Sequence, residues 1–409
     1  MISNSMFKNT VLFFVFLLVL QVNFESHAAT PIHTKEKERN LQVGAENTSV
    51  YFPLIEGKKI GILTNQTGVV SNPADNNAYT LSVVDFLMNN KMNIVKIYAP
   101  EHGFRGTASA GELIKDGKDT QTGLPIISLY GNSKKPSKKQ LEGIDVMLFD
   151  LQDVGARFYT YISSLHYVME ACAENNIPVV VLDRPNPNIS IIDGPTLEIA
   201  NKSFVGMHTI PAMHGMTIGE YALMINGQKW LEKEIQCNLT VVPVQHYTRK
   251  MTYSLPVAPS PNLPNDKAIN LYASLCFFEG TNVSSGRGTD LQFQVYGSPF
   301  LTQMPYQFTP KPNIGAKDPM NNGKLCYGEN LSKTPDVNKL DLKWLLKAYK
   351  SSTNKDKFFN NFFIKLAGTD ALKEQIITGK TEDEIRLTWQ KGLDQFKAMR
   401  KPYLLYSAN

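Results

Sequence analysis

Ile144-Asp-Val-Met-Leu-Phe149 is a short apolar run that leads directly into the polar segment Asp150-Leu-Gln-Asp-Val-Gly-Ala-Arg157. Three more runs have this form, at 59–63, 93–98 and 177–182, and they lead into polar residues at 64–68, 99–106 and 183–187. Short apolar runs between turn-forming residues are typical of buried strands. If the four strands are parallel, their polar ends share one sheet edge, where open α/β folds bind ligands. The pattern therefore predicts where a site lies.

Helical patterns separate these runs. Apolar residues recur at helical spacing in 81–90, 158–174 and 216–226, and Ser137 to Gln140 has the form of a capping box. Another apolar run, at 239–245, follows as a strand. This alternation predicts an α/β fold with a doubly wound, mostly parallel sheet over residues 47–254.

The pattern changes at residue 255. Four prolines between Pro256 and Pro264 indicate a boundary or a rigid crossover. Residues 300–329 are rich in Pro, Asn and Gly, whereas the tail from residue 340 has helical spacing. We expect residues 255–409 to form a second, smaller α+β domain at the C-terminus.

The first 28 residues have the features of a signal peptide. Lys8 precedes the apolar stretch 11–20, and Ser26-His-Ala28 fits a small-residue cleavage site. The stretch is shorter than the roughly 20 apolar residues that span a membrane. We therefore expect an exported protein, periplasmic or extracellular, without a membrane anchor after cleavage. Residues 29–46 are charged at first and lack periodicity, which predicts a flexible leader.

The composition narrows the class of partner. The net charge of +5 is not clustered, and no Lys/Arg block favours a nucleic acid. The four cysteines have no metal-ligand spacing, so disulfides and buried free thiols both remain possible. The lone Gly286-Arg-Gly288 is too short for a dinucleotide fingerprint, and no Walker A or HExxH motif occurs.

Glu101 and His102 form the first candidate site, in a loop flanked by Pro100 and Gly103. Either side chain can transfer protons near neutral pH if burial tunes its pKa. The alternative is a turn whose Glu accepts backbone N–H bonds.

Asp150, Gln152, Asp153, Arg157 and Tyr161 form the second candidate group, ahead of a predicted helix. An Arg suits a carboxylate ligand, and Tyr rings suit a sugar face. Carboxylates at a helix N-terminus and a tyrosine in the core are equally good explanations.

Two further polar segments carry alternatives. Asp183, Arg184 and Asn186 lie beside Pro185 and Pro187, whose rigid φ angles fix the segment, and an Asp–Arg ion pair and an Asx-turn explain these residues equally well. His214 precedes Thr217-Ile-Gly-Glu220, a capping box that makes Glu220 a helix cap rather than a catalyst.

Seven segments together carry a family resemblance. Among them are Ala99-Pro-Glu-His-Gly-Phe-Arg-Gly106 and Asp183-Arg-Pro-Asn-Pro187, and the others lie at 61–68, 150–161, 214–217, 259–264 and 280–289. In this order, from about Gly57 to the C-terminus, the chain resembles the NamZ-type exo-β-N-acetylmuramidases. One departure is residues 290–293, where relatives often show Pro-Phe, and we expect a local change in the cleft wall there.

The resemblance implies a glycoside hydrolase that releases terminal N-acetylmuramic acid from the non-reducing ends of peptidoglycan fragments. It also implies a Rossmann-like catalytic domain, an auxiliary C-terminal domain and an active site in the cleft between them. It implies no nucleotide cofactor and no essential metal.

Glycoside hydrolysis assigns roles to these residues. Glu101 is the predicted general acid, with His102 beside it, and Asp150 or Asp153 is expected to position the acetamido group or activate water. The lactyl carboxylate of muramic acid calls for a cation, for which three arginines are candidates: Arg157, Arg184 and Arg287. The other predicted substrate contacts are Asn65, Arg105, Gln152, Tyr161, Asp183, Asn186, His214, Asn262 and Asn282.

Two rival functions use the same residues. One is a metal-assisted hydrolase built on Glu101, His102, Asp150, Asp153 and His214, although their spacing fits no known ligand pattern. The other is a two-lobed, non-catalytic sugar-binding protein of the cell envelope.

Overall fold

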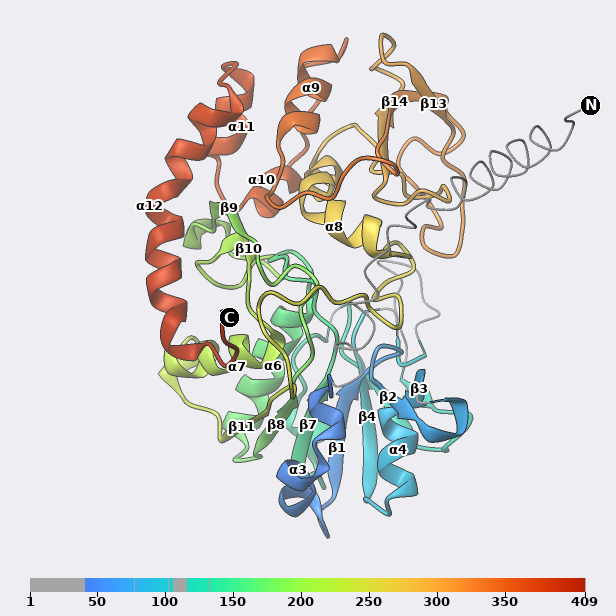
Figure 1. The fold of residues 1–409 in the computed structure, drawn as a ribbon, viewed down its shortest axis with the longest axis vertical. Coiled ribbons are helices and arrows are strands. Elements are labelled where there is room, and N and C mark those ends of the chain that lie inside the picture. The colour runs from blue at the N-terminus through green and yellow to red at the C-terminus, as the bar shows by residue number, and fades with distance from the viewer. Residues whose placement is uncertain (1–40, 77, 102, 106–115, 132, 409) are drawn as a thin grey trace, which may run out of the picture. The chain divides into compact units, whose positions relative to one another are not determined.

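This computed structural model describes residues 41–76, 78–101, 103–105, 116–131 and 133–408 (Figure 1). The predicted signal peptide and residues 29–40 of the predicted leader lie outside these ranges. Residues 41–46 differ from the leader expectation, because Leu41 and Val43 are buried in the core. The Gly44 N–H donates to the Asp183 carbonyl at 2.8 Å, and a Cβ at this glycine would lie 2.4 Å from the Val242 carbonyl oxygen. This segment therefore packs against the central sheet.

The central sheet has seven strands in the order β11-β8-β7-β1-β4-β6-β5. Its strands are β1 (Ile60–Thr64), β4 (Ile94–Ala99), β5 (Gly117–Lys118), β6 (Pro125–Ser128), β7 (Val146–Asp150), β8 (Val179–Leu182) and β11 (Leu239–Val242). All neighbouring pairs are parallel except β5 with β6. The four predicted strands therefore end at one edge, and the α/β class is confirmed.

Helices cover both faces of this sheet. They are α3 (Thr48–Ile55), α4 (Val83–Asn89), α5 (Lys138–Leu141), α6 (Tyr161–Glu174) and α7 (Ile218–Gly227). Ile62 and Leu148 belong to a hydrophobic cluster with residues of α3 and α4. Their neighbours Leu63 and Phe149 belong to a second cluster with residues of α6 and α7. Side chains alternate between the two faces because successive residues of a strand point in opposite directions.

The C-terminal elements combine helices with a small antiparallel sheet. The helices are α8 (Asp266–Leu275), α9 (Lys343–Ser351), α10 (Phe362–Ala367), α11 (Ala371–Ile377) and α12 (Glu382–Arg400). The sheet, in the order β12-β14-β13, consists of β12 (Val295–Ser298), β13 (Tyr306–Phe308) and β14 (Cys326–Asn330). This composition is α+β, as predicted. The contacts join residues 41–409 into one compact unit, so the boundary at 254/255 stays a prediction.

Short elements complete the fold. Two antiparallel pairs are β2 (Val69–Asn72) with β3 (Ala78–Ser82), and β9 (Ile192–Thr196) with β10 (Pro211–His214). The 3₁₀ turns are η1 (Gly44–Glu46), η2 (Pro73–Asp75), η3 (Ile199–Asn201), η4 (Glu232–Glu234), η5 (Cys276–Gly280) and η6 (Lys401–Tyr403). Figure 1 shows the long helix α12 passing β9 and β10 and ending near α7.

The capping boxes predicted at Ser137 and Thr217 are present at the starts of α5 and α7, and α12 also begins with a capping box, at Thr381. Glu220 therefore caps α7, and it also pairs with Arg249. The four cysteines are buried free thiols. Within the described ranges, no helix is long and apolar enough to cross a membrane.

Candidate active site

A cavity of about 580 Å³ opens beyond the carboxyl edge of the sheet. From the sheet side it is lined by Glu101 after β4, Tyr130 after β6 and Thr160 before α6. The C-terminal half contributes Tyr272, Cys276, Glu279, Arg287, residues 315–320, Phe362 and Leu366. A smaller cavity of about 50 Å³ shares Glu101 and Arg287 and adds Tyr161, Asn262 and Phe293, among others. Both halves of the chain therefore build one site.

Glu101 presents its carboxyl to this cavity from a tight turn. The Gly103 N–H closes the turn on the Pro100 carbonyl at 3.1 Å, and Gly103 has a φ of 76°, which glycine adopts without strain. The Tyr130 hydroxyl donates to Oε1 of Glu101 at 3.0 Å, and the Thr160 hydroxyl donates to Oε2 at 3.4 Å. Burial and the Glu101 charge raise the pKa of Tyr130, so this phenol stays protonated and remains a donor.

Arg287 is the cation of the cavity wall that the sequence predicted. It lies between Gly286 and Gly288, whose φ values of 83° and 78° require glycine. Its Nε donates to Oε1 of Glu279 at 2.6 Å, and its guanidinium carbon lies 5.0 Å from the ring centroid of Phe293. Burial lowers the pKa of Arg287, but the Glu279 carboxylate outweighs this and raises it. A quarter of the side chain is exposed, so a charged guanidinium borders the cavity.

Four predicted site residues line the two cavities: Glu101, Tyr161, Asn262 and Arg287. The Nδ2 of Asn262 donates to the Gly315 carbonyl at 2.7 Å, while its buried Oδ1 has no hydrogen-bond partner among the described residues. The Tyr161 hydroxyl accepts from Nδ2 of Asn65 at 2.6 Å, so Asn65 supports the cavity from behind. His102 lies outside the described residues.

Asp150 and Arg184 form a buried ion pair at the sheet edge instead of reaching the cavity. Arg184 donates from Nε to Oδ1 at 2.5 Å and from Nη2 to Oδ2 at 2.8 Å. Its Nη2 also donates to the Val69 carbonyl at 3.0 Å. An ion pair involving Arg184 was one of the alternatives, but its partner is Asp150 and not the adjacent Asp183. The pair joins the ends of β7 and β8.

Arg157 is fully buried and has a structural position. Its Nη1 donates to the carbonyls of Pro195 and Ile210, and its Nη2 to those of Leu366 and Ala367, each at 2.8 Å. Burial lowers its pKa to about 10, which still leaves a cation near neutral pH. All four acceptors are backbone groups, so this guanidinium joins two chain segments. The expectation that Arg157 binds the lactyl carboxylate is corrected by this placement.

Asp183 is also an anchor rather than a ligand residue. It accepts bonds from the Gly219 N–H at 2.8 Å, the Thr217 hydroxyl at 2.7 Å and the Tyr406 hydroxyl at 2.5 Å. Burial raises its pKa to about 7 against the effect of these bonds. The carboxylate therefore joins the start of α7 to the C-terminal tail.

The remaining predicted contacts are bonded within the protein and do not line the described part of either cavity. Asp153 accepts from the Gly155 N–H at 2.7 Å, and Nε2 of His214 lies 3.3 Å from its Oδ2 without hydrogen-bond geometry. Three side-chain amides donate hydrogen bonds to backbone carbonyls: Gln152 to Pro185, Asn186 to Met216 and Asn282 to Lys357. Arg105 forms an ion pair with Asp119.

Tyr130 and Glu279 are site residues that the sequence did not indicate. Tyr130 lies two residues beyond β6, a strand that was not predicted from the sequence. Its position after a strand was the only feature of the sequence that could have indicated it. Glu279 directly precedes the 280–289 segment, and only its ion pair with Arg287 in the folded chain identifies it as a site residue.

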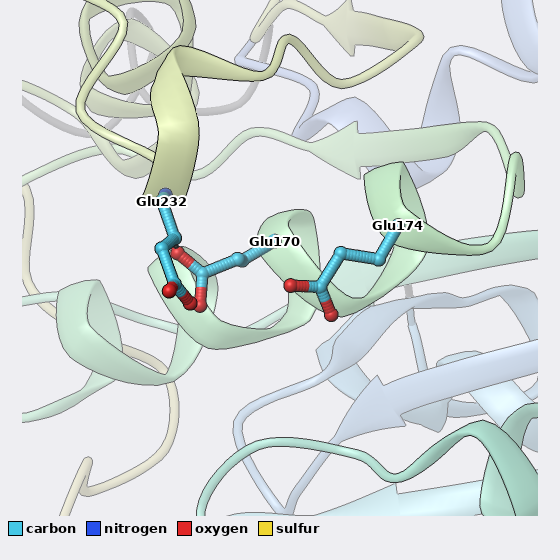
Figure 2. Close-up of side chains that lie close together, drawn as sticks. All are labelled: Glu170, Glu174 and Glu232. Carbon is cyan, nitrogen blue, oxygen red and sulfur yellow. Dashed lines mark hydrogen bonds between the residues drawn. The ribbon is translucent and has the colours of Figure 1, made fainter.

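One acidic cluster has metal-like spacing. Carboxylate oxygens of Glu170, Glu174 and Glu232 lie within 4.8 Å of one another (Figure 2). The Lys135 ammonium binds Glu170 and Glu174 at 2.8 Å each and neutralises much of this charge. The cluster lies on α6 and η4 and contributes nothing to the cavity, so it provides no catalytic metal site.

Two family models and several relatives match this chain. The models are described as exo-beta-N-acetylmuramidase NamZ, N-terminal, over residues 60–267, and the C-terminal counterpart over residues 270–406. The peptidoglycan beta-N-acetylmuramidase NamZ of Bacillus subtilis (strain 168) is 37% identical, over 98% of this chain and 100% of that protein.

Two crystal structures of DUF1343 family proteins from Bacteroides fragilis NCTC 9343 have the same fold. One is 46% identical with a TM-score of 0.83, covering 90% of this chain and 100% of that chain. The other is 28% identical with a TM-score of 0.74, covering 90% and 99%. The matches of both family models together span most of the described residues, and the chain therefore belongs to the NamZ family of exo-β-N-acetylmuramidases.

Proposed function

We propose that this protein is an exo-acting β-N-acetylmuramidase that hydrolyses terminal, non-reducing N-acetylmuramic acid from peptidoglycan fragments. The observation that carries the proposal is the cavity in which Glu101 and Arg287 face the same space. A carboxyl can protonate the glycosidic oxygen, and a guanidinium can pair with the lactyl carboxylate that distinguishes muramic acid from glucosamine.

Glu101 is the proposed general acid. Its carboxyl borders the cavity, and hydroxyls on two different loops fix both oxygens. In the bond-breaking step it transfers a proton to the leaving oxygen as the bond to the anomeric carbon breaks. Asp150 and Asp153 do not line the described cavity, which argues against either as the partner of Glu101. The other carboxylates among the described cavity-lining residues are Glu279 and Asp318, and the acetamido group of the substrate is a third candidate.

Arg287 is the residue proposed to bind the lactyl carboxylate. Of the three predicted arginines, Arg157 and Arg184 form buried bonds within the protein, whereas Arg287 borders both cavities. Glu279 holds the guanidinium in place but also offsets part of its charge. We therefore expect the substrate carboxylate to bind a guanidinium that is already paired with Glu279, and this partial neutralisation suits reversible binding.

The test is a paired assay with chromogenic β-N-acetylmuramide and β-N-acetylglucosaminide. We expect turnover of the muramide only. Glu101→Gln should lower kcat by roughly 10²–10⁴-fold, while the exposed control Glu142→Gln should match the wild type. Arg287→Met should raise KM for the muramide. Equal rates on both sugars would refute lactyl recognition, and full activity of Glu101→Gln would refute the assignment of the acid.

Export is part of the proposal. The substrate lies in the cell wall, and residues 1–28 have the n-region, apolar stretch and cleavage site of a signal peptide. The experiment is N-terminal sequencing of the protein recovered outside the cytoplasm, which should give a mature start near Ala29. Recovery of an uncleaved chain in the cytoplasm would contradict it.

A further inference from the structure

A second cavity, of about 680 Å³, lies between the β9–η3 segment and helices α11 and α12. We name it the α11–α12 groove. Its lining residues are Pro195, Thr196, Leu197, Glu198, Ile199, Thr209, Thr369, Ala371, Gln375, Thr388, Trp389, Gly392 and Gln395. None of these residues lines the active cavity.

We propose that the α11–α12 groove is a binding site for an uncharged, N-acetylated glycan segment. The choice of a glycan rests on the proposed function, because the substrate polymer carries such sugars beyond its reacting end. The groove itself takes no part in the reaction.

The polar groups of the lining suit an uncharged ligand. Glu198 is the one ionisable side chain among the described lining residues, and its Oε1 already accepts from the Thr369 hydroxyl at 2.6 Å. The other polar groups are hydroxyls and amides, which exchange hydrogen bonds with sugar hydroxyls and acetamido groups. An anionic stem peptide would find no cation here.

Two buried polar atoms of groove-lining residues lack hydrogen-bond partners among the described residues: Oε1 of Gln375 and Oγ1 of Thr196. Gln375 is only 9% exposed, and its Nε2 donates to the Thr388 hydroxyl at 3.2 Å. A buried polar atom without a partner destabilises the folded chain. A ligand N–H would satisfy this oxygen after a rotation of the amide toward the groove.

The groove and the active cavity share a wall. The Arg157 guanidinium joins the Pro195 and Ile210 carbonyls, on the segment that forms one side of the groove, to the end of α10. In that segment Leu197 lines the groove and Phe204 lines the active cavity. A Cβ at Gly368 would lie 2.7 Å from Nη2 of Arg157 and 2.9 Å from Leu197, so these groups are in close contact. This proximity suits a ligand that extends beyond the reacting sugar.

The experiment is calorimetric titration with chitotetraose, a neutral N-acetylated tetrasaccharide without muramic acid. Thr209→Arg places a bulky charge at an exposed lining residue, and Gln375→Leu removes the unpartnered oxygen. The matched control is Gln390→Leu, an exposed glutamine of α12 that does not line the groove. Both groove variants should bind about tenfold more weakly, and the control should bind as the wild type does.

Two further readouts separate a binding role from a structural one. Gln375→Leu should not lower the Tm. It removes a buried oxygen without a partner among the described residues, and the Thr388 hydroxyl, which loses the 3.2 Å bond from Nε2, keeps its own bond to the Ile385 carbonyl. Binding should also be insensitive to salt, since no ion pair is formed. Absence of binding to the wild type at millimolar chitotetraose, or binding that both groove variants retain, would overturn the proposal. The small chromogenic muramide occupies only the active cavity, so its hydrolysis should not depend on the α11–α12 groove and tests the proposed function separately.

Discussion

The hydroxyl of Tyr130 donates to Oε1 of Glu101 across 3.0 Å, a shorter bond than the 3.4 Å bond from the Thr160 hydroxyl to Oε2. Tyr130 therefore positions the carboxyl of the proposed acid.

Tyr130→Phe should lower kcat by about tenfold through loss of this positioning. The measurement is kcat and KM on the chromogenic muramide. Thr160→Val, which removes the longer bond of 3.4 Å, should lower kcat by a smaller factor. Wild-type kcat in Tyr130→Phe would contradict this positioning role.

Arg157→Met should destabilise the fold by more than about 3 kcal/mol, because four buried carbonyls each lose a charged donor. The measurement is the free energy of unfolding in urea, together with KM for the muramide on the folded fraction. Arg287→Met is the comparison, since it should change KM more than stability. A raised KM in Arg157→Met without lost stability would restore Arg157 as a substrate contact.

Glu170 should contribute stability that depends on acidity. Burial would raise its pKa, but bonds from His166 and Lys135 lower the pKa from its ordinary value of 4.5 to about 2. A depressed carboxyl pKa stabilises the fold above the unfolded value and loses this contribution as pH falls from 4.5 toward 2. The shift corresponds to at most about 3 kcal/mol.

The measurement is the free energy of unfolding of the wild type and Glu170→Gln between pH 2 and pH 7. The stability difference between them should be largest near neutral pH and shrink below about pH 4.5. Glu174→Gln is the matched control, because its side chain is 40% exposed and shares only Lys135. A difference that is constant with pH would contradict the role of ionised Glu170.

Chelation should leave activity unchanged. The described residues of the metal-assisted alternative do not converge on the cavity. Arg184 occupies both oxygens of Asp150, and Asp153, whose Oδ2 lies 3.3 Å from Nε2 of His214, is not among the described lining residues. The measurement is muramide hydrolysis after dialysis against EDTA. Loss of activity that Zn²⁺ or Mg²⁺ restores would favour the metal-assisted hydrolase.

The local pattern of the sequence determined the architecture. The apolar runs before Thr64, Ala99, Asp150 and Asp183 became parallel strands that end at one edge, because a buried strand needs only short-range hydrophobic continuity. The capping boxes marked helix starts for the same reason, since both partners lie within one turn. Glu101 was identifiable because it follows an apolar run in a glycine-flanked loop and no capping box accounts for it.

Tertiary structure alone decided which polar residues meet a ligand. Arg157 and Arg287 are chemically alike, yet both terminal nitrogens of Arg157 bind carbonyls, up to 210 positions away, whereas Arg287 borders a cavity. Asp150 was equally ambiguous until the fold placed Arg184 against it. A side chain's availability depends on long-range partners that cancel its hydrogen-bonding capacity, and no local spacing encodes them. The sequence therefore located the sheet edge, and the fold filled most of that edge with internal bonds and left the cavity around Glu101.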